Sequence, residues 1–256
     1  MAKTALVTGA TAGIGYELAK LFAKDGFELA LVARDTARLE GVAKEMGAIS
    51  GCAARAIAAD LSQPEAPQSI FDQVQSVDCL VNNAGFGLCA PFSQSDLETE
   101  LAMIQVNITA LVDLSKLFLH GMVERGSGRI LNVASTAAFQ PGPLMAIYYA
   151  SKAFVLSFSE AIAEELRGSG VTVTTLCPGP TATEFQKRAR IEQIPLVKNK
   201  VLGMMTAAEA AQTGYRGMMR GKVLVIPGIL NRLGVQSLRI APRAIVRRVA
   251  RLLQES

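Results

Sequence analysis

The chain has 256 residues, of which half are hydrophobic and only 19% are charged, with a formal net charge of +4. This length accommodates one large α/β domain that buries a substantial core. No apolar run reaches the ~18 to 20 residues that a membrane-spanning helix needs. A single histidine and four cysteines without a C-x-x-C pair argue against a metal site. Because Met1 leads directly into a predicted strand, we expect no signal peptide, reduced thiols and a cytoplasmic location.

Seven short apolar runs predict strands, and segments with helical spacing fill the gaps between them. The predicted strands comprise residues 4–8, 28–33, 53–59, 77–81, 128–134, 171–177 and 222–226. Continuous apolar runs are typical of parallel strands that are buried on both faces. The alternation therefore predicts a doubly wound parallel sheet of about seven strands, with helices on both faces, in a single domain over residues 1–256. Ligands of such sheets bind outside the carboxyl ends of the strands.

A glycine-rich turn follows the first predicted strand and precedes a helical segment at residues 17–24. From Thr8 to Gly15 it reads T-G-A-T-A-G-I-G. Glycines let the backbone approach a pyrophosphate closely, and the free N–H groups of a helix start attract the anion. The turn predicts a dinucleotide site, although a glycine-rich βα turn without a ligand can have the same spacing.

A phenol and an ammonium group are paired far downstream, at Tyr148 and Lys152. Four residues apart on a helix, the two side chains share one face. A nearby ammonium favours the phenolate, so we expect Lys152 to lower the pKa of Tyr148. The pair predicts a proton donor for a carbonyl oxygen or a proton acceptor for an alcohol.

Further motifs accompany these two in a characteristic order. N-N-A-G occupies Asn82–Gly85, P-G occupies Pro178–Gly179, and Ser135 lies thirteen positions before Tyr148. With these motifs the chain resembles the short-chain dehydrogenase/reductase family from its first strand to about residue 228. The resemblance implies a Rossmann-type fold and an enzyme that transfers a hydride between a nicotinamide dinucleotide and a carbonyl or alcohol.

The resemblance also implies roles for individual residues. Ser135 would hydrogen-bond the reacting oxygen, Lys152 would also reach the nicotinamide ribose, and Asn107 would hold a water linked to Lys152. The implied catalytic residues are Asn107, Ser135, Tyr148 and Lys152. The implied cofactor contacts are Gly9, Thr11, Gly13, Ile14, Gly15, Arg34, Asp60, Leu61, Asn83, Ala84, Gly85, Tyr148, Lys152, Pro178, Gly179, Thr181 and Thr183.

The end of the second predicted strand bears on the choice of cofactor. An acid there would bind the ribose 2′-OH, but the position is Ala33, followed by Arg34. Since a guanidinium binds a phosphate through two hydrogen bonds, NADP(H) is the preferred cofactor. Asp35 has a spacing close to that of NAD-binding acids, which keeps NAD(H) as an alternative, but we expect it in the loop outside the ribose pocket. Arg38 either assists Arg34 or is a surface residue.

Two neighbouring residues offer alternative registers for the catalytic groups. Tyr149 lies three residues before Lys152, and Thr136 follows Ser135. The spacing in the family selects Tyr148 together with Ser135. Tyr149 is then interpreted as a packing residue or part of the pocket wall.

The segments that would surround a substrate are mostly apolar. They include Phe86, Phe139 and Met145, and a predicted lid over residues 181–206 adds Phe185, Ile191, Ile194, Leu196, Met204 and Met205. Apolar walls with few polar groups suit a small hydrophobic carbonyl or alcohol, such as a ketone, a 3-oxoacyl compound or a steroid- or lipid-like molecule.

The C-terminal segment, residues 229–256, is basic and amphipathic. Residues 210–256 contain nine basic side chains and one acidic side chain. Pro242 is expected to open a final helix with apolar residues on one face and arginines on the other. We expect this helix to pack on its own domain or on a partner subunit, with contact to an anionic membrane surface as the alternative. Without a recognised nucleic-acid-binding motif, we expect no binding to nucleic acid.

The motifs together predict an NADP(H)-dependent oxidoreductase that interconverts a carbonyl and a secondary alcohol. Two alternatives remain at this stage, namely an NAD-dependent alcohol dehydrogenase of the same family and a dinucleotide-binding regulator without turnover. Members of the family often form dimers or tetramers, so the resemblance also implies a homodimer or homotetramer.

Overall fold

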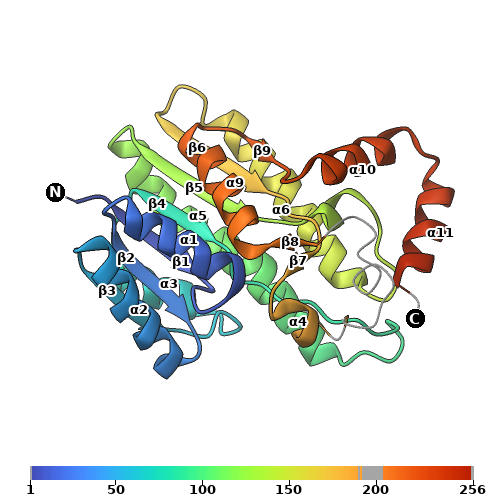
Figure 1. Ribbon diagram of the computed structural model, residues 1–256, viewed down its shortest axis with the longest axis horizontal. Coiled ribbons are helices and arrows are strands. Elements are labelled where there is room, and N and C mark those ends of the chain that lie inside the picture. The colour runs from blue at the N-terminus through green and yellow to red at the C-terminus, as the bar shows by residue number, and fades with distance from the viewer. Residues whose placement is uncertain (1, 190, 192–203, 255–256) are drawn as a thin grey trace.

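The computed structural model describes residues 2–189, 191 and 204–254. Its centre is a parallel sheet of seven strands in the order β3-β2-β1-β4-β5-β6-β9 (Figure 1). The strands are β1 (Thr4–Thr8), β2 (Glu28–Ala33), β3 (Ala54–Ala58), β4 (Cys79–Asn82), β5 (Gly128–Val133), β6 (Val171–Leu176) and β9 (Leu224–Val225). All seven predicted strands are present, although most are shorter than predicted. The doubly wound parallel fold is therefore confirmed.

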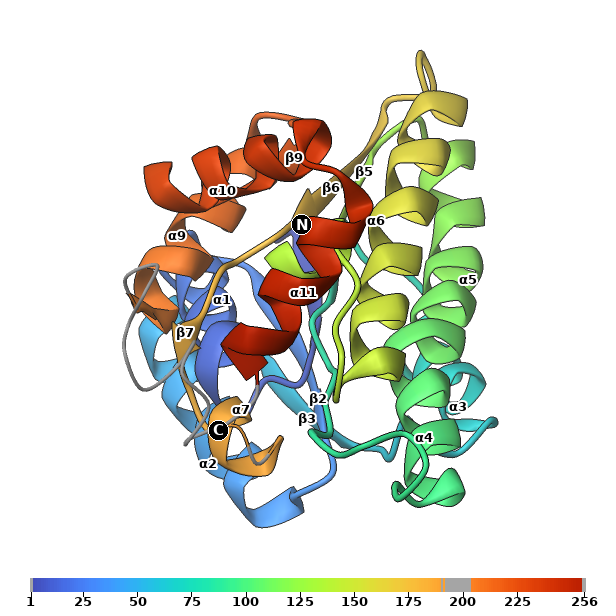
Figure 2. The same ribbon diagram turned by 90° about the vertical axis from the view of Figure 1, so that its right-hand side faces the viewer.

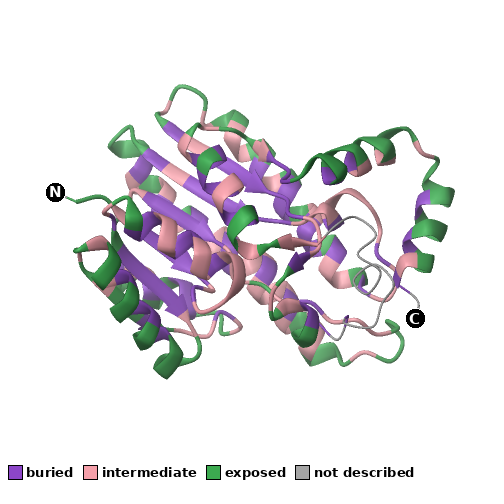
Figure 3. Cartoon of the chain, in the orientation of Figure 1, coloured by how far each residue is buried: buried purple, intermediate pink, exposed green. Residues whose placement is uncertain are grey.

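Helices cover both faces of this sheet. One face carries α1 (Gly13–Lys24), α2 (Thr36–Ser50) and α9 (Ala207–Met219), and the other carries α3 (Ala66–Val74), α5 (Ala110–Glu124) and α6 (Ala146–Glu165). The burial pattern follows from this sandwich, because the central strands are buried from both sides whereas the edge strand β3 and the outer helix faces are largely exposed (Figure 3). The four cysteines, which all lie in the described part of the chain, are free thiols.

The helix that precedes β5 is interrupted by a wider turn. It starts as α4 (Leu97–Ile104), passes through the π-helical turn η1 (Gln105–Thr109) and continues as α5. The combined helix, Leu97–Glu124, is long and apolar enough to cross a membrane by length and composition, contrary to the expectation from the sequence. Core helices of soluble proteins meet the same criteria, and this one packs Leu114 and Phe118 into the core beside α3 and β4. The π-helical turn directs Asn107 inward, and the side chain of Asn107 is buried.

A second, smaller sheet lies beyond the end of β6. It pairs β7 (Thr181–Ala182) with β8 (Met205–Thr206) and was not expected from the sequence. Between these strands, the described part of the lid contains the short helix α7 (Phe185–Arg188). The predicted lid residues Ile194 and Leu196 lie outside the described residues.

The C-terminal helices extend from the sheet as an arm. This arm comprises α10 (Ile229–Ile240) and α11 (Arg243–Gln254), and Figures 1 and 2 show α11 at the far end of the molecule from β2 and β3. As expected, α11 begins directly after Pro242. It buries Val246, Ala250 and Gln254, one residue per turn, and Gln254 donates a hydrogen bond from Nε2 to the Tyr149 hydroxyl. One face of α11 therefore packs on its own domain.

Candidate active site

A cleft of about 920 Å³ opens at the carboxyl ends of the strands. Its size matches that of ordinary small-molecule sites. All of the predicted site residues line this cleft except Gly15 and Asn107, which lie behind its wall. The fold thus brings together motifs that are spread over 175 residues, from Gly9 to Thr183.

Hydrogen bonds in both directions join the glycine turn to the N-N-A-G segment. The Thr8 hydroxyl accepts bonds from the backbone N–H groups of Asn83 and Ala84, both at 3.0 Å, and donates to the Val81 carbonyl. In return, Asn83 Nδ2 donates to the carbonyls of Thr8 and Gly9, at 2.9 and 3.2 Å. Thr8 and Asn83 therefore hold the carboxyl ends of β1 and β4 in register around the turn.

Glycine is required at two positions of the turn for different reasons. Gly9 has φ +67°, which favours glycine. At Gly15 a Cβ would lie 2.3 Å from both the Gly9 carbonyl oxygen and Asn83 Nδ2. Gly15 thus acts by permitting close helix–turn packing, which explains why it does not line the cleft.

The start of α1 provides the chemistry that a pyrophosphate needs. Its N-cap residue is Ala12, whose side chain cannot cap the helix, and Gly13 and Ile14 border the cleft directly. The N–H groups of an uncapped first turn attract an anion. Thr183 reaches across from the lid, so that a Cβ on Gly13 would come within 3.0 Å of it. The residues present therefore fit a dinucleotide whose phosphates would be held at the start of α1.

The adenosine end of the cleft carries both Arg34 and Asp35. Arg34 is exposed at the rim and forms no ion pair with any described residue. Asp35 is the N-cap of α2 and accepts a 3.0 Å hydrogen bond from the Arg38 backbone N–H, which occupies one carboxylate oxygen. Asp35 also borders the cleft, so the expectation that it lies outside the pocket is wrong in part. Asp60 accepts from the Ser62 backbone N–H, an interaction typical of a turn after a strand.

The catalytic candidates meet where β5 and α6 approach each other. Lys152 is 5% exposed, and its Nζ donates a 2.8 Å hydrogen bond to the carbonyl of Val133, the last residue of β5. The same Nζ lies 5.8 Å from the centre of the Tyr148 ring. Ser135 lies two residues beyond the end of β5, and its Oγ accepts a 3.1 Å hydrogen bond from the Ala137 backbone N–H. Tyr148, Ser135 and Lys152 thus face one end of the cleft.

Burial controls the acidity of both members of the Tyr148–Lys152 pair. It raises the pKa of Tyr148 above its ordinary value of 10.0, and hydrogen bonding with Ser135 offsets only part of this increase. This direction is opposite to the one expected from the spacing with Lys152. The physical reason is that burial disfavours the charged phenolate. Burial likewise disfavours the ammonium and lowers the pKa of Lys152 to about 8. The half-buried phenol therefore keeps its proton at neutral pH, which is the form that a proton donor needs.

Asn107 acts behind the wall of the cleft. Its Oδ1 accepts from the Phe86 backbone N–H, and its Nδ2 donates to the Phe86 carbonyl and to Ser151 Oγ, both at 3.0 Å. At Gly85 a Cβ would lie 3.0 Å from Asn107 Oδ1 and 3.3 Å from Lys152 Nζ. The absence of a side chain at Gly85 therefore lets Asn107 and Lys152 lie close together.

The remainder of the cleft is largely apolar, as expected. Its walls include Phe86, Ala137 and Met145, together with Phe185 and Ile191 of the lid. The C-terminal helices add residues that were not expected there, namely Asn231, Gly234, Val235, Ser237, Leu238, Val249 and Leu253. Tyr149 is buried, borders the cleft and contacts Tyr148 edge-on, which agrees with its interpretation as part of the wall.

Several residues that shape the site were missed from the sequence. Thr8 belongs to the glycine motif and had a recognisable position, but its hydroxyl anchors the N-N-A-G segment rather than a ligand. Ser151 bonds Asn107 and the Tyr148 carbonyl. Glu184 borders the cleft from the lid and carries no sequence signal of this role.

Comparison with known proteins agrees with this geometry. Residues 3–194 match the family model for short chain dehydrogenases. The chain belongs to the short-chain dehydrogenase/reductase family of NAD(P)-dependent oxidoreductases. A very-long-chain 3-oxoacyl-CoA reductase of Anas platyrhynchos is 37% identical over 193 residues, which cover 72% of this chain and 61% of the relative. This chain therefore spans about three fifths of the length of that relative.

Two further relatives extend this comparison. A serine 3-dehydrogenase of Rhizobium radiobacter is 36% identical over 72% of this chain and 74% of its own. A short-chain dehydrogenase from Sphingobium yanoikuyae, solved in complex with NADPH, is 32% identical and has a TM-score of 0.82, with coverage of 94% of this chain and 97% of that one. The similarity in fold therefore extends beyond the matched family segment into the C-terminal part of the chain.

The packing at Gly15 predicts the effect of a single methyl group. The Gly15→Ala variant should lose about 1–3 kcal/mol of unfolding free energy, because the new Cβ overlaps the Gly9 carbonyl and the Asn83 amide. Urea unfolding measures this loss. Gly41→Ala is the matched control, since a Cβ there has no neighbour within 4 Å on helix α2. The control should stabilise by about 0.5–1 kcal/mol, and an equal loss in both variants would contradict the packing argument.

The low pKa of Lys152 predicts a stability that depends on pH. Between about 8 and 10.5 the folded chain has released the Lys152 proton whereas the unfolded chain retains it, so stability should rise as pH increases through this interval. At about 1.4 kcal/mol per pH unit the full gain is about 3 kcal/mol. Urea unfolding of the cofactor-free protein at a series of pH values measures it against Lys152→Met. A constant difference between the two proteins from pH 7 to pH 10 would contradict the buried-ammonium assignment.

Proposed function

We propose that this protein is an NADP(H)-dependent oxidoreductase that interconverts a carbonyl and a secondary alcohol on a hydrophobic substrate. The observation that carries the proposal is the convergence of Ser135, Tyr148 and Lys152 at one end of a cleft whose other end is built by the glycine turn. A regulator without turnover would need Lys152 to bind the nicotinamide ribose, but it would have no need for the hydroxyls of Ser135 and Tyr148 beside it.

The proposed proton chemistry follows from the side chains. In the reducing direction the Tyr148 hydroxyl donates its proton to the carbonyl oxygen, while Ser135 donates a hydrogen bond to the same oxygen as negative charge develops on it. The Lys152 ammonium, 5.8 Å from the Tyr148 ring centre, stabilises the phenolate that results. Bound nicotinamide supplies the hydride. In the oxidising direction the phenolate accepts the alcohol proton.

The preference for NADP(H) rests on the rim of the adenosine end. Arg34 borders the cleft with its guanidinium uncommitted to any described acid, whereas the carboxylate of Asp35 is partly engaged as a helix cap. A guanidinium pairs well with a 2′-phosphate. The bound NADPH named for the Sphingobium yanoikuyae relative supports the same choice.

The proposed substrate class rests on the apolar walls. Phe86, Met145 and Phe185 surround the catalytic end, and Val249 and Leu253 of α11 extend the apolar lining away from it. Such a lining suits an extended hydrophobic ketone or 3-oxoacyl compound. The 3-oxoacyl-CoA reductase named among the relatives supports this class.

Replacement of Tyr148 tests the proposal directly. Against a panel of hydrophobic ketones and a 3-oxoacyl thioester, Tyr148→Phe should lower kcat by about 100-fold or more because the proton donor is lost. The affinity for NADPH, measured by fluorescence titration, should stay within about twofold because the lost hydroxyl acts in the chemical step.

Tyr149→Phe is the matched control for the choice of register. It removes a hydroxyl from the adjacent position and should retain kcat within about tenfold. Loss of turnover in Tyr149→Phe with retention in Tyr148→Phe would overturn the assignment. Absence of NADPH oxidation by the wild type with every substrate of the panel would favour a dinucleotide-binding regulator.

We also propose peripheral contact of the C-terminal arm with an anionic membrane surface. Although α11 packs through Val246, Ala250 and Gln254, its residues Ile245, Val249 and Leu252 are 47–70% exposed. Exposed arginines share the helix, among them Arg247 and Arg248. Apolar side chains beside guanidinium groups are typical of helices that lie in the headgroup region.

Vesicle co-sedimentation tests this contact. The wild type should pellet with vesicles that contain anionic lipid, and the double variant Ile245→Glu with Leu252→Glu should stay in solution because two charges replace the exposed apolar side chains. Ile49→Glu, at an exposed apolar position on α2, is the control that should still pellet. Equal binding by the wild type and the double variant would exclude the arm as the contact.

The assembly and compartment are likewise proposals. We propose a homo-oligomer formed through helices that flank the sheet, where Val123 on α5 and Phe154 on α6 are exposed. Analytical ultracentrifugation distinguishes a monomer, a dimer and a tetramer. The four free thiols are consistent with a reducing compartment such as the cytoplasm.

A further inference from the structure

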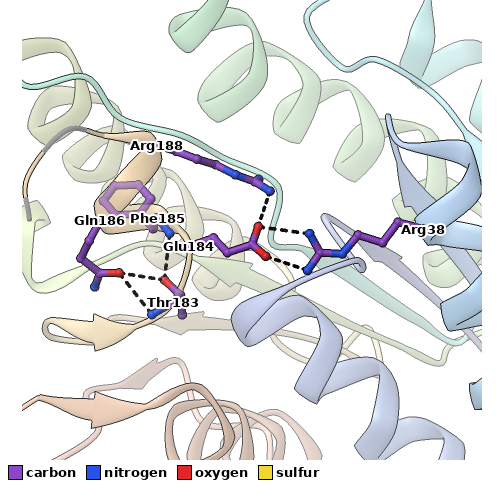
Figure 4. A network of polar contacts seen from close by, with 6 residues as sticks. All are labelled: Arg38, Thr183, Glu184, Phe185, Gln186 and Arg188. Carbon is purple, nitrogen blue, oxygen red and sulfur yellow. Dashed lines mark hydrogen bonds and ion pairs between the residues drawn. The ribbon is translucent and has the colours of Figure 1, made fainter.

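One carboxylate of the lid is held by two guanidinium groups (Figure 4). Glu184 accepts two hydrogen bonds from Arg38, at 2.7 Å from Nη2 to Oε1 and at 3.2 Å from Nη1 to Oε2. It also accepts a 2.5 Å bond from Arg188 on the following turn. Arg38 and Glu184 are 146 positions apart in the sequence, so this ion pair joins the first turn of α2 to the lid.

The ion pair lies beside the adenosine end of the proposed cofactor site. Arg38 does not itself line the cleft but lies one helical turn beyond Arg34 and Asp35, which border it, and its partner Glu184 borders the same cleft. The preceding residue, Thr183, lies against Gly13 in the phosphate turn. The lid therefore crosses the cleft at Thr183 and is tied to α2 at Glu184.

Both partners of the pair are charged at neutral pH. The hydrogen bond to Glu184 raises the pKa of Arg38, and the hydrogen bond from Arg38 lowers the pKa of Glu184. The side chains of Arg38 and Glu184 are 42% and 45% exposed. Exposed ion pairs are weak, so a stronger anion can displace the carboxylate.

A 2′-phosphate is such an anion. It carries a charge of about −1.5 to −2 at neutral pH and binds a guanidinium through two parallel hydrogen bonds. One N–H group of each terminal nitrogen of Arg38, the two that form its end-on fork, is already engaged by Glu184. The same two nitrogens cannot at once pair with a carboxylate and with a phosphate in this fork geometry.

We propose that Glu184 competes with the 2′-phosphate of NADP(H) for Arg38, and that this competition sets how strongly the protein prefers NADP(H) over NAD(H). The inference rests on the proposed use of these cofactors. NAD(H) carries a hydroxyl at the 2′ position and leaves the Arg38–Glu184 pair intact. Binding of NADP(H) transfers Arg38 to the phosphate, frees Glu184 and loosens the tie between α2 and the lid.

The first test compares Glu184→Gln with the wild type by fluorescence titration of NADPH and NADH. Removal of the competing carboxylate should tighten NADPH binding about three- to fivefold, with NADH within about twofold. Glu40→Gln is the matched control, since Glu40 is an exposed acid on α2 two residues beyond Arg38. It removes the same charge nearby and should leave both affinities within about twofold.

A double-mutant cycle separates competition for Arg38 from a general effect of charge. In the Arg38→Gln background the Glu184→Gln substitution should no longer tighten NADPH binding, because the contested guanidinium is absent. An equal gain in both backgrounds would overturn the inference, since it would reflect only the lost negative charge. Unchanged or weaker NADPH binding by Glu184→Gln in the wild-type background would also overturn it.

The failure of this inference is distinguishable from failure of the proposed function. Tight binding of NADPH and NADH by the wild type, with an unaltered ratio in Glu184→Gln, overturns the role of Glu184 alone. Absence of binding of either dinucleotide by the wild type overturns the proposed cofactor and the inference with it.

Discussion

The hydrogen bonds between Thr8 and Asn83 are the constraint on which the site depends. They join the carboxyl ends of β1 and β4, the two central strands from which the chain continues in opposite directions along the sheet. A cleft opens at such a point because the helices that follow the two strands lie on opposite faces. Gly9 and Gly15 have no side chains to separate these parts, so the phosphate turn and the segment that leads to the catalytic end form one rigid unit.

The catalytic end of the cleft contains the ammonium group of Lys152 in a buried position, where burial disfavours its positive charge. Lys152 is buried between α6 and β5, and its ammonium is compensated by a single carbonyl, that of Val133. The neighbouring helix has a π turn that brings Asn107 close, and Gly85 leaves the space for both side chains. The charge on Lys152 therefore lowers the stability of the fold, whereas the proposed proton transfer from Tyr148 depends on that charge.

The lid and the C-terminal arm complete the cleft from outside the sheet. Each is attached by a polar contact between residues distant in the sequence, Glu184 with Arg38 and Gln254 with Tyr149. These contacts do not involve the strands of the sheet. They determine which side chains a ligand meets in the cleft. Loops and terminal helices commonly carry specificity in this way, on a scaffold whose core is set by packing.

Local patterns in the sequence predicted the parallel sheet, the glycine turn and the Tyr148–Lys152 pair, because each depends on residues close together in the chain. Ser135 and Asn107 were predicted from the resemblance to a family instead. Apolar runs predict buried strands, and the four-residue spacing of Tyr148 and Lys152 places both on one helix face. Only the tertiary structure decided the direction of the pKa shift of Tyr148, the partner of Arg38 and the contribution of α11 to the cleft. Burial and contacts across 105 or 146 positions depend on how all the elements pack, which no local pattern encodes.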